Sequence, residues 1–327
     1  PLNHFFPGTP VLSFGTAGCN LGCKFCQNWD ISKSREVERL SAIAEPQQIA
    51  EAARSTQCTS VAYTYNDPII WAEYAIDTAQ ACRAAGIKNV AVTAGYITPE
   101  ARPEFFEYMD AANVDLKAFT EDFYHKVTYS HLAPVLETLE YLKHETDVWF
   151  ELTNLIIPDT NDNPGELRKM CDWVLEALGD DVPIHFTAFH PDFRMTDRGR
   201  TQPETLALAR EIAFEQGLKY AYVGNVHDVT RQSTFCPNCH EILIERNWHQ
   251  LGRYNIDVAG CCKSCQTPIP GRFAAAKGEW GARRLPILID QYSSQTSPTN
   301  HLESQANKGL SVTSANQEAQ DANGMNT

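Results

Sequence analysis

Residues 13–26 read Ser-Phe-Gly-Thr-Ala-Gly-Cys-Asn-Leu-Gly-Cys-Lys-Phe-Cys and follow an apolar run that begins at Val11. That run predicts a first β-strand, so Cys19, Cys23 and Cys26 are expected in the loop at its carboxyl end. The C-x3-C-x2-C spacing lets three thiolates from one short loop converge on an iron–sulfur cluster. Three ligands leave one iron of a four-iron cluster without a protein thiolate. An open metal position of this kind is what catalysis requires.

A second interpretation of this loop is a zinc or ferredoxin-type site that is completed by a distant fourth ligand such as Cys58. We favour the open cluster because the loop directly follows the first strand of a βα series. Loops at the carboxyl ends of parallel strands are where such folds bind their ligands.

The fold is predicted by the pattern that extends outward from this loop. From residue 11 to about 224, short apolar or β-branched runs alternate with amphipathic helical runs, which is typical of consecutive βα units and a parallel sheet. Six units and a seventh strand are too few for a closed eight-stranded barrel. We therefore expect an α/β fold, a partial (βα)6 TIM-like barrel, with a doubly wound open sheet as the alternative. The predicted strands begin at Val11, Ser60, Lys88, Asn113, Asp147, Pro183 and Lys219.

Two helix starts are marked by caps. Thr98 and Asn163 each directly precede a proline, which places a capping side chain ahead of a proline at the first helical position. Glu166 adds a predicted capping box to the second of these helices. Apolar stripes at helical spacing predict helices that cover a sheet; they comprise Leu167, Met170, Cys171, Val174, Leu175 and Leu178, and Leu132, Val135, Leu136 and Leu139.

The chain divides into three predicted parts. The barrel is expected to span residues 1–230, and a small four-cysteine metal-binding module with short apolar strands, among them Ile242-Leu243-Ile244, is expected over 231–291. Residues 292–327 are rich in Ser, Thr, Asn, Gln and Glu, and we expect a disordered tail there because they cannot bury enough apolar surface.

A second cysteine group lies in the module. Two C-x2-C pairs separated by 22 residues match the paired-knuckle pattern of a closed four-thiolate site, which predicts a zinc-ribbon-like module with structural zinc. Rubredoxin-like iron, or an auxiliary cluster that uses the adjacent Cys261, is the alternative, because spacing does not choose the metal. The four predicted ligands are Cys236, Cys239, Cys262 and Cys265.

Composition restricts the compartment and the partners. The net charge of -14 disfavours nucleic acid and anionic membrane as partners. The sequence has no apolar run of 18 residues, so a cytoplasmic protein is expected. Eleven cysteines are too few for a disulfide scaffold, and eight of them fall into the two groups, which indicates metal binding in a reducing compartment. The three that stand apart, Cys58, Cys82 and Cys171, are expected to be small buried hydrophobes.

The three-cysteine loop resembles that of the radical S-adenosylmethionine (SAM) superfamily, whose motif is CxxxCxxC with an aromatic residue before the last cysteine, here Phe25. The sequence is more closely similar to the pyruvate formate-lyase activating enzyme-like group and, within it, to the AmmeMemoRadiSam system radical SAM enzymes. The likeness covers about residues 1–290. Relatives usually carry a further N-terminal segment with its own cysteines, which this sequence does not show. The supporting stretches are Pro1-Leu2-Asn3-His4-Phe5, Cys26-Gln27-Asn28-Trp29, Tyr63-Thr64-Tyr65-Asn66-Asp67-Pro68, Ala94-Gly95-Tyr96-Ile97-Thr98-Pro99, Asp115-Leu116-Lys117 and Tyr222-Val223-Gly224-Asn225.

The resemblance implies a [4Fe-4S] cluster whose open iron chelates SAM. An electron from a donor such as a flavodoxin or ferredoxin would then break the bond between the sulfur and the 5′-carbon, giving a 5′-deoxyadenosyl radical that abstracts hydrogen from a substrate. The hydrogen donor stays open between a glycine on a partner protein and a small molecule. The rival hypothesis is a non-catalytic iron–sulfur electron-transfer or metal-binding protein. By resemblance, SAM would be contacted by Phe25, Asn66, Asp67, Asp115 and Lys117.

Three of these side chains have structural alternatives. Asp67 stands where this group usually has Glu, and an Asp before a proline also suits a turn or helix cap. Asp115 and Lys117 are expected to point into the barrel from one face of the strand, where they would otherwise form a buried salt bridge. His190 follows the sixth strand and would face either substrate or a structural hydrogen-bond partner.

Overall fold

The computed structural model describes residues 1–33 and 42–292. Seven parallel strands form one sheet in which each strand pairs with the next along the chain, and β1 and β7 are its two edges. A doubly wound sheet reverses its strand order part-way, so this uninterrupted order confirms the partial barrel. The strands are β1 (Val11–Phe14), β2 (Ser60–Tyr63), β3 (Lys88–Thr93), β4 (Ala111–Asp115), β5 (Trp149–Ile156), β6 (Ile184–Ala188) and β7 (Ala221–Gly224).

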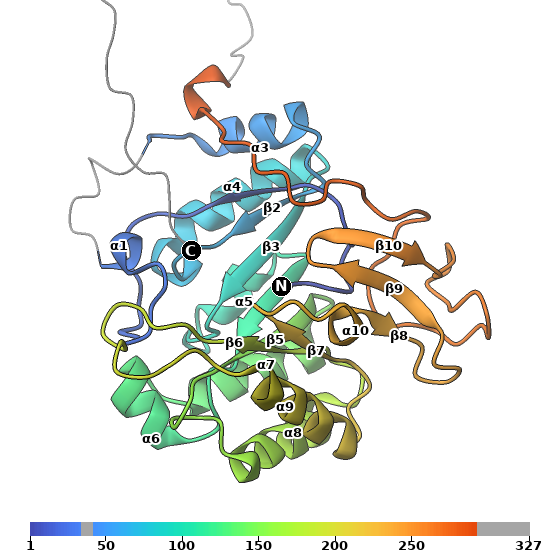
Figure 1. Cartoon of the computed structure of the whole chain (residues 1–327). Coiled ribbons are helices and arrows are strands. Elements are labelled where there is room, and N and C mark those ends of the chain that lie inside the picture. The colour runs from blue at the N-terminus through green and yellow to red at the C-terminus, as the bar shows by residue number, and fades with distance from the viewer. Residues whose placement is uncertain (34–41, 293–327) are drawn as a thin grey trace, which may run out of the picture. The chain divides into compact units, whose positions relative to one another are not determined.

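Helices between the strands cover the outer face of the sheet (Figure 1). Every residue of the predicted α8 stripe is buried except Leu175, which is partly buried, and this confirms that α8 is amphipathic. No helix in the described ranges is both long and apolar enough to cross a membrane. The longer helices are α3 (Pro46–Ser55), α4 (Ala72–Ala84), α7 (Ala133–Glu145), α8 (Pro164–Leu178) and α9 (Pro203–Glu215), and α5 (Arg102–Phe106) is a single short turn of helix. The short ones are α1 (Trp29–Ser32), η1 (Pro68–Trp71), α6 (Glu121–Phe123), the π-turn η2 (Tyr124–Thr128), α10 (Val229–Gln232) and η3 (Ile289–Gln291).

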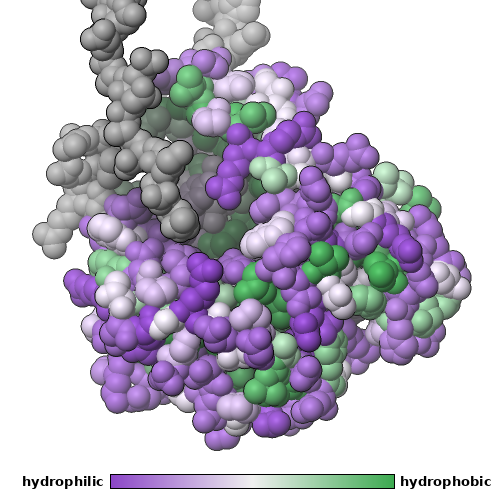
Figure 2. Space-filling model, in the orientation of Figure 1, coloured by the Kyte–Doolittle hydropathy of each residue, from purple (hydrophilic) through white to green (hydrophobic). Residues whose placement is uncertain are grey.

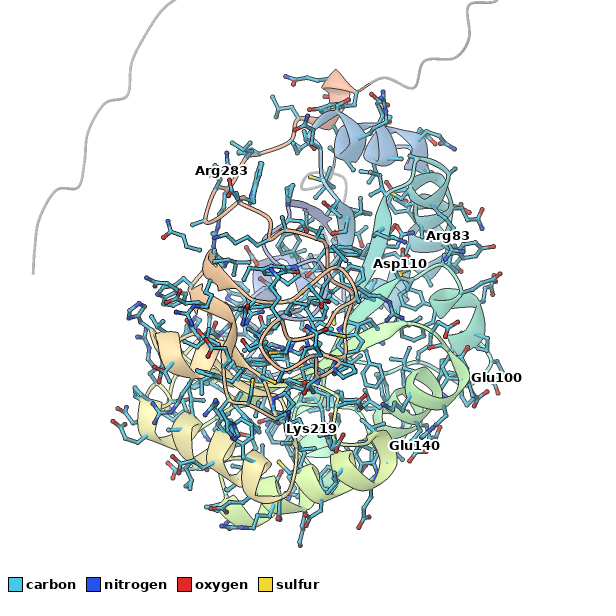
Figure 3. All side chains as sticks on the ribbon, turned by 90° about the vertical axis from the view of Figure 1, so that its right-hand side faces the viewer. Arg83, Glu100, Asp110, Glu140, Lys219 and Arg283 are labelled. Atoms are coloured by element: carbon cyan, nitrogen blue, oxygen red, sulfur yellow. The ribbon has the colours of Figure 1, made fainter. Side chains whose placement is uncertain are left out.

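The main core lies between the strands and these helices. Cys58, Cys82 and Cys171 are all buried in it, which confirms their expected role as small hydrophobes. Charged side chains such as Glu100 and Glu140 lie at the outer rim of the molecule (Figure 3). Polar groups therefore surround a continuous apolar layer, as expected for a barrel of this type.

Two details of the predicted helix starts are wrong. The helix after Thr98 does not begin at the following proline, because residues 99–101 form a turn and α5 begins only at Arg102. Asn163 caps α8 as predicted, since its Oδ1 accepts a hydrogen bond from Gly165 N at 2.8 Å. The carboxylate of Glu166, however, accepts from Phe119 N at 2.9 Å instead of completing a capping box. The cap at Asn163 can be predicted from the local sequence, whereas Phe119, the partner of Glu166, lies 47 residues away along the chain.

A second, three-stranded antiparallel sheet follows the barrel. It has the order β10-β9-β8, with β8 (Thr234–Phe235), β9 (Ile242–Asn247) and β10 (Gln250–Tyr254). The predicted strand at Ile242 is β9, and the four cysteines of the second group lie in the loops around this sheet. Residues Pro1–Ser294 form one compact unit. The division into 1–230 and 231–291 stays a prediction, and the predicted tail lies, from residue 293 on, outside the described residues.

The amino-terminal ends of the barrel strands hold a buried polar network that sequence patterns did not reveal. The carboxylate of Glu151 accepts hydrogen bonds from the backbone N of Asn3 at 2.8 Å and of His4 at 2.7 Å, and it lies 2.7 Å from Nε2 of His185. Hydrogen bonding and the positive charge around it outweigh burial and hold the pKa of Glu151 near 2. Nε2 of His4 lies 2.7 Å from the hydroxyl of Tyr222 on β7.

This network reaches into the four-cysteine module. The hydroxyl of Tyr222 lies 2.9 Å from Oγ1 of Thr234 on β8. Arg246 on β9 is buried, and it donates to Thr234 Oγ1 at 2.6 Å and to the carbonyl of Asn3 at 2.7 Å. Buried polar groups need such partners, so these bonds fix the module against the barrel.

Candidate functional site

The three-cysteine loop leaves the carboxyl end of β1 and is anchored by backbone hydrogen bonds. Gly22 N donates to Thr128 O at 2.8 Å, and Lys24 N donates to Val127 O at 3.0 Å, so the loop pairs with the π-turn η2. The side chain of Asn20 donates to the carbonyl of Tyr96, after β3, at 2.9 Å. The cysteines are therefore held over the carboxyl ends of several strands, which is where the sequence places them.

Gly15 and Asn66, two residues beside the loop, are each required by close contacts with the neighbouring backbone. A Cβ at Gly15 would lie 2.2 Å from the carbonyl oxygen of Thr64, so only glycine allows this approach to β2. Asn66 donates from Nδ2 to the carbonyl of Gly18 at 2.6 Å and accepts from the indole of Trp71 at 3.3 Å. Asn66 thus fixes the turn that precedes the first cysteine of the loop.

The thiols of Cys19, Cys23 and Cys26 suit a cluster better than a single ion. Among the residues that the structure describes, only the second cysteine group brings three or more ligand atoms to within 4.8 Å of one another. The wider spacing of the first group is what a cluster needs, because each thiolate binds a different iron. Cys23 is buried and the other two are half-buried. Burial raises the pKa of Cys23 to about 11, so binding of iron must displace its proton.

Asp115 and Lys117 form an ion pair at the carboxyl end of β4. Nζ of Lys117 lies 2.9 Å from Oδ2 of Asp115, and their side chains are 13% and 34% exposed. Burial acts to lower the pKa of Lys117, but the charges of Asp115 and Cys23 outweigh it and raise that pKa. The ammonium also lies 5.8 Å from the ring centre of Phe25. The two side chains thus form the salt bridge that was the structural alternative to a contact with SAM, and Asp115, at 34% exposed, stays accessible to a further ligand.

Asp67 is a helix cap with additional partners. Its Oδ1 accepts a hydrogen bond from the backbone N of Ile69, in the first turn of η1, at 3.2 Å. The same oxygen accepts from the hydroxyl of Thr93 at 2.9 Å. Its Oδ2 accepts from Ala94 N at 2.8 Å. Burial raises the pKa of Asp67 despite these hydrogen bonds. The carboxylate thus joins β3 to η1, and one acceptor position on Oδ2 is left for another donor.

The structure brings most predicted site residues together. Lys117 lies close enough to Cys19, Cys23 and Asp67 for its charge to act on the pKa of all three. The side chain of Phe25 is buried against Phe123, with ring centres 6.1 Å apart, so a contact with adenine would come from its backbone.

His190 lies beside the third cysteine of the loop. Its Nδ1 is 2.9 Å from Nε2 of Gln27, the residue after Cys26, and its Nε2 is 4.0 Å from Asp192. The side chain is 47% exposed. These contacts give His190 hydrogen-bond partners, and its exposure leaves it accessible at the rim of the site.

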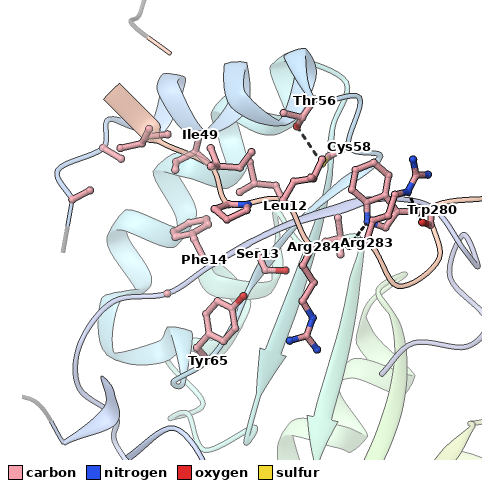
Figure 4. A pocket seen from close by; sticks show the side chains of 18 of the residues that line it. Leu12, Ser13, Phe14, Ile49, Thr56, Cys58, Tyr65, Trp280, Arg283 and Arg284 are labelled. Atoms are coloured by element: carbon pink, nitrogen blue, oxygen red, sulfur yellow. Dashed lines mark hydrogen bonds between the residues drawn. The ribbon is translucent and has the colours of Figure 1, made fainter. Parts of the chain in front are cut away.

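A cleft of about 950 Å³ adjoins the loop at the open edge of β1. It is lined by apolar residues such as Leu12, Phe14 and Ile49 and bordered by the segment 280–289, and Figure 2 shows it as a hollow in this face. Tyr65 reaches into it, as does the guanidinium of Arg284 (Figure 4). Tyr65 has a φ of 72°, and its carbonyl accepts from Asn28 at 2.8 Å. The cleft contains none of the cysteines of the loop but begins directly behind it.

The second cysteine group forms a compact four-thiol site. The Sγ atoms of Cys236 and Cys265 are 3.5 Å apart, and those of Cys239 and Cys262 are 3.7 Å apart. Metal–sulfur bonds of about 2.3 Å in a tetrahedron give sulfur–sulfur edges of about 3.8 Å, so the four thiols fit one ion. The site can bind a metal whose identity the thiols alone do not fix.

The two knuckles of this site have matching backbones. His240 and Gln266, which directly follow the second cysteine of each pair, both have a φ of 60°. Cys261 is outside the set, and its Sγ lies 4.0 Å from the carbonyl of Ala259. An auxiliary cluster that uses Cys261 is therefore not supported by this arrangement.

Comparison with known proteins agrees with this geometry. The family model described as the radical SAM superfamily matches residues 14–174, which include the three-cysteine loop and the Asp115–Lys117 pair. The chain belongs to the radical SAM superfamily. An uncharacterized protein of Methanocaldococcus jannaschii is 42% identical over 266 residues, which cover 81% of this chain and 79% of that protein.

Solved radical SAM structures share the fold at low sequence identity. A radical SAM methyltransferase from Sphaerobacter thermophilus is 16% identical, with 67% of each chain covered and a TM-score of 0.54. SuiB of Streptococcus suis bound to S-adenosylmethionine is 11% identical, with 68% of this chain and 51% of that chain covered and a TM-score of 0.54. Membership in the radical SAM superfamily implies a [4Fe-4S] cluster and SAM, and the three thiols described above suit such a cluster.

Several residues that shape this radical SAM site were missed in the sequence. The π-turn η2 and the positive φ of Tyr129, 57°, leave no simple sequence signal, because they depend on packing against Gly22. The stacking of Trp29 on Phe193, with ring centres 5.6 Å apart, joins segments 164 residues apart. Trp29 itself, an aromatic residue three positions after Cys26, is the one signal in the sequence that points to this stacking.

Proposed function

We propose that this chain binds a [4Fe-4S] cluster through Cys19, Cys23 and Cys26 and uses it to cleave SAM reductively. When bound, such a cluster would supply the one electron that cleaves SAM into methionine and a 5′-deoxyadenosyl radical, which would abstract a hydrogen atom from a substrate to give 5′-deoxyadenosine. The observation that supports this most strongly is geometric: the loop that carries the three thiols also carries Phe25, whose ring centre lies 5.8 Å from the Lys117 ammonium, and Lys117 pairs with Asp115 at 2.9 Å. Three thiols and a charged pair in one place are the parts that SAM binding at an open iron needs.

The charged pair is proposed to orient SAM. SAM carries an ammonium, a carboxylate and a sulfonium, so a site that binds it needs both signs of charge. Asp115 is partly exposed and offers a carboxylate to a cation, while Lys117 offers an ammonium to an anion. Charge-assisted hydrogen bonds of this kind are the stronger ones in proteins. The buried Phe25 beneath Lys117 limits how far the ammonium can move.

Asn66 and Asp67 are proposed as positioning residues that also border SAM. Both are buried and hold the loop or the start of η1 through the hydrogen bonds described above. The remaining acceptor position on Asp67 suits the ammonium of SAM, as the resemblance implies. Loss of the Asn66 side chain would displace the turn that precedes Cys19, and loss of the Asp67 side chain would release the start of η1 from β3. Each substitution would therefore also act on SAM indirectly, through the backbone that surrounds the loop.

The substrate is proposed to reach the loop along the cleft beside β1. The cleft is large enough for a small molecule or an extended peptide segment, with Tyr65 and Arg284 at its wall. A glycine on a partner protein, as in a glycyl radical enzyme activase-like reaction, and a small molecule therefore both remain substrate hypotheses. The four-thiol site is proposed to hold structural zinc, because all its positions are filled by protein.

A comparison of two cysteine variants tests the function. The protein is reconstituted anaerobically with iron and sulfide, reduced with dithionite and supplied with SAM, and 5′-deoxyadenosine is measured by chromatography. We expect the wild type and Cys82→Ala, a buried cysteine of the core, to form 5′-deoxyadenosine, and Cys23→Ala to form none. A wild type that assembles a four-iron cluster but never cleaves SAM would instead support the non-catalytic iron–sulfur protein.

A further inference from the structure

The outer edge of β1 is unpaired in the part of the chain that the structure describes. β1 is an edge strand of the seven-stranded sheet, and β2 is its partner there. The carbonyls of Pro10 and Phe14 accept hydrogen bonds, at 3.0 and 2.9 Å, from the backbone N of the residues that flank β2. Peptide groups alternate sides along a strand, so the N–H and C=O groups of Val11 and Ser13 point to the open edge.

This open edge borders the cleft of about 950 Å³ described above. Every residue of β1 lines the cleft, and so does the segment 280–287. That segment is joined to the chain just before β1, where Trp280 N donates to the carbonyl of Gly8 at 3.1 Å, and it then leaves the strand. A strand edge that faces a cleft offers a row of backbone donors and acceptors to an extended peptide.

The two sides of β1 give the cleft an apolar side and a polar side. Leu12 and Ile49, on α3, both belong to the main core cluster and lie on one side of the strand. Ser13, Tyr65 and Arg284 lie on the other side (Figure 4). Side chains alternate along a strand in the same way, so a strand added here presents every second side chain to the apolar side and the others to the polar side.

Arg284 makes the polar side of the cleft positive. Its guanidinium extends into the cleft, and no carboxylate oxygen of the described residues lies within 4.0 Å of it. The neighbouring Arg283 differs, because its Nε donates to the carbonyl of Trp280 at 2.8 Å and its guanidinium lies 4.5 Å from the ring centre of that residue. Guanidinium groups bind carboxylates through charge-assisted hydrogen bonds. Arg284 therefore selects acidic side chains on the polar side.

We propose that the open edge of β1 binds an extended peptide segment of a partner protein, in which apolar and acidic residues alternate, as an added strand. The backbone of the segment bonds to Val11 and Ser13, its apolar side chains lie beside Leu12, and a carboxylate pairs with Arg284. A small anion would use only the last of these contacts and would leave the strand edge unpaired.

The position of this site connects it with the three-cysteine loop. β1 leads directly into that loop, so a segment bound along β1 lies beside the proposed SAM site. As a choice of substrate class, this inference rests on the proposed function, because only SAM cleavage would make the bound segment a substrate. As a binding site it requires neither SAM nor a reduced cluster, so it is tested without them.

The test measures peptide binding to the full chain with its metals bound and its cluster oxidised. The probe is a pool of acetylated peptides of about six residues, the usual length of a strand, that alternate glutamate with valine, isoleucine or leucine. A matched pool has lysine in place of glutamate. Affinity is measured by fluorescence anisotropy, and hydrogen exchange of single backbone amides is measured by mass spectrometry. Arg284→Glu reverses the charge in the cleft, and Arg168→Glu is the matched control on α8, where Arg168 is 47% exposed.

We expect the glutamate pool to reach half-saturation below about 1 mM and to slow exchange at Val11 and Ser13 roughly tenfold or more. The amides that already face β2 should change less. Arg284→Glu should weaken binding of the glutamate pool roughly tenfold and favour the lysine pool, whereas Arg168→Glu should do neither.

Three results would overturn strand addition at β1. One is no saturable binding of the glutamate pool, and another is binding that leaves exchange at Val11 and Ser13 unchanged. The third is displacement of the pool by an equal concentration of N-acetylglutamate amide, which would indicate a site for a small anion. A wild type that cleaves no SAM in the separate 5′-deoxyadenosine assay would refute the proposed function and would leave the result on peptide binding valid.

Discussion

Lys117→Met is expected to weaken SAM binding by about tenfold while leaving the fold intact. Methionine keeps the length and the apolar contact of the side chain with Phe25 but removes the ammonium that lies 2.9 Å from Asp115. The variant thus separates the charge of Lys117 from its packing. Because Lys117 lies near Cys23 and pairs with Asp115, the substitution acts at the proposed SAM site.

The magnitude follows from how exposed the pair is. A hydrogen bond to a charged group contributes about 1.5–3 kcal/mol when it is buried. The bond that the variant removes is the proposed one from the Lys117 ammonium to SAM. Lys117 is 13% exposed and the adjoining Asp115 is 34% exposed, so solvent screens this site and we expect SAM binding to lose about 1.5 kcal/mol. That free energy corresponds to about a tenfold change in the Kd of SAM. The unpaired Asp115 remains hydrated, so the free energy of unfolding should fall by less than about 1 kcal/mol.

The assay is titration of SAM into the reconstituted, reduced protein, followed by the change in the EPR signal of the cluster. Lys126→Met is the matched control, because it breaks an exposed ion pair with Asp122 at 2.6 Å on η2 and should leave the Kd unchanged. If Lys117→Met binds SAM as tightly as the wild type, Lys117 has no part in the SAM site. Equal weakening in both variants would indicate a general effect of charge.

Three further outcomes are expected. Glu151→Gln places an amide NH2 where two donors point at a carboxylate oxygen, so it should lower the free energy of unfolding by about 3 kcal/mol in urea denaturation, whereas the exposed Glu241→Gln should change it by under about 1 kcal/mol. Burial lowers the pKa of His4 to about 4, so the folded protein holds this ring neutral while the unfolded chain takes up a proton below about pH 6.5. The free energy of unfolding should therefore be about 2.5 kcal/mol lower at pH 4.5 than at pH 7, and His4→Gln should flatten this pH dependence in urea denaturation. Cys239→Ser should abolish stoichiometric metal in the four-thiol site by elemental analysis, and Cys261→Ser should not; loss in both would place Cys261 among the ligands.

The barrel was predictable because its signals are local. Predicted strand starts at Val11, Ser60 and Lys88 match β1, β2 and β3, and the others fall within two residues of the observed starts. Alternating strand and helix patterns repeat along the chain, and each helix carries its own apolar stripe. The helix after Thr98 was misplaced, because a proline at the first helical position also suits the turn that forms there.

The site was predictable only in part. Cysteine spacing identifies the loop and the four-thiol site without a structure, since the ligands are close in sequence. The double role of Asp67, which caps η1 and also joins β3, depends on Thr93 and Ala94, which are brought near by strand pairing. Glu151 and His4 lie 147 residues apart, and nothing in the sequence around either predicts that a carboxylate there is buried with several donors.

The central claim is that the loop holds a cluster with one iron open to SAM. The most direct test is electron–nuclear double resonance on the reduced, reconstituted protein with SAM labelled with nitrogen-15 in its amino group or oxygen-17 in its carboxylate. We expect magnetic coupling of both labels to the cluster, which would show that the amino acid part of SAM is bound to iron. If the cluster forms and SAM binds but neither label couples to it, the open-iron account is contradicted.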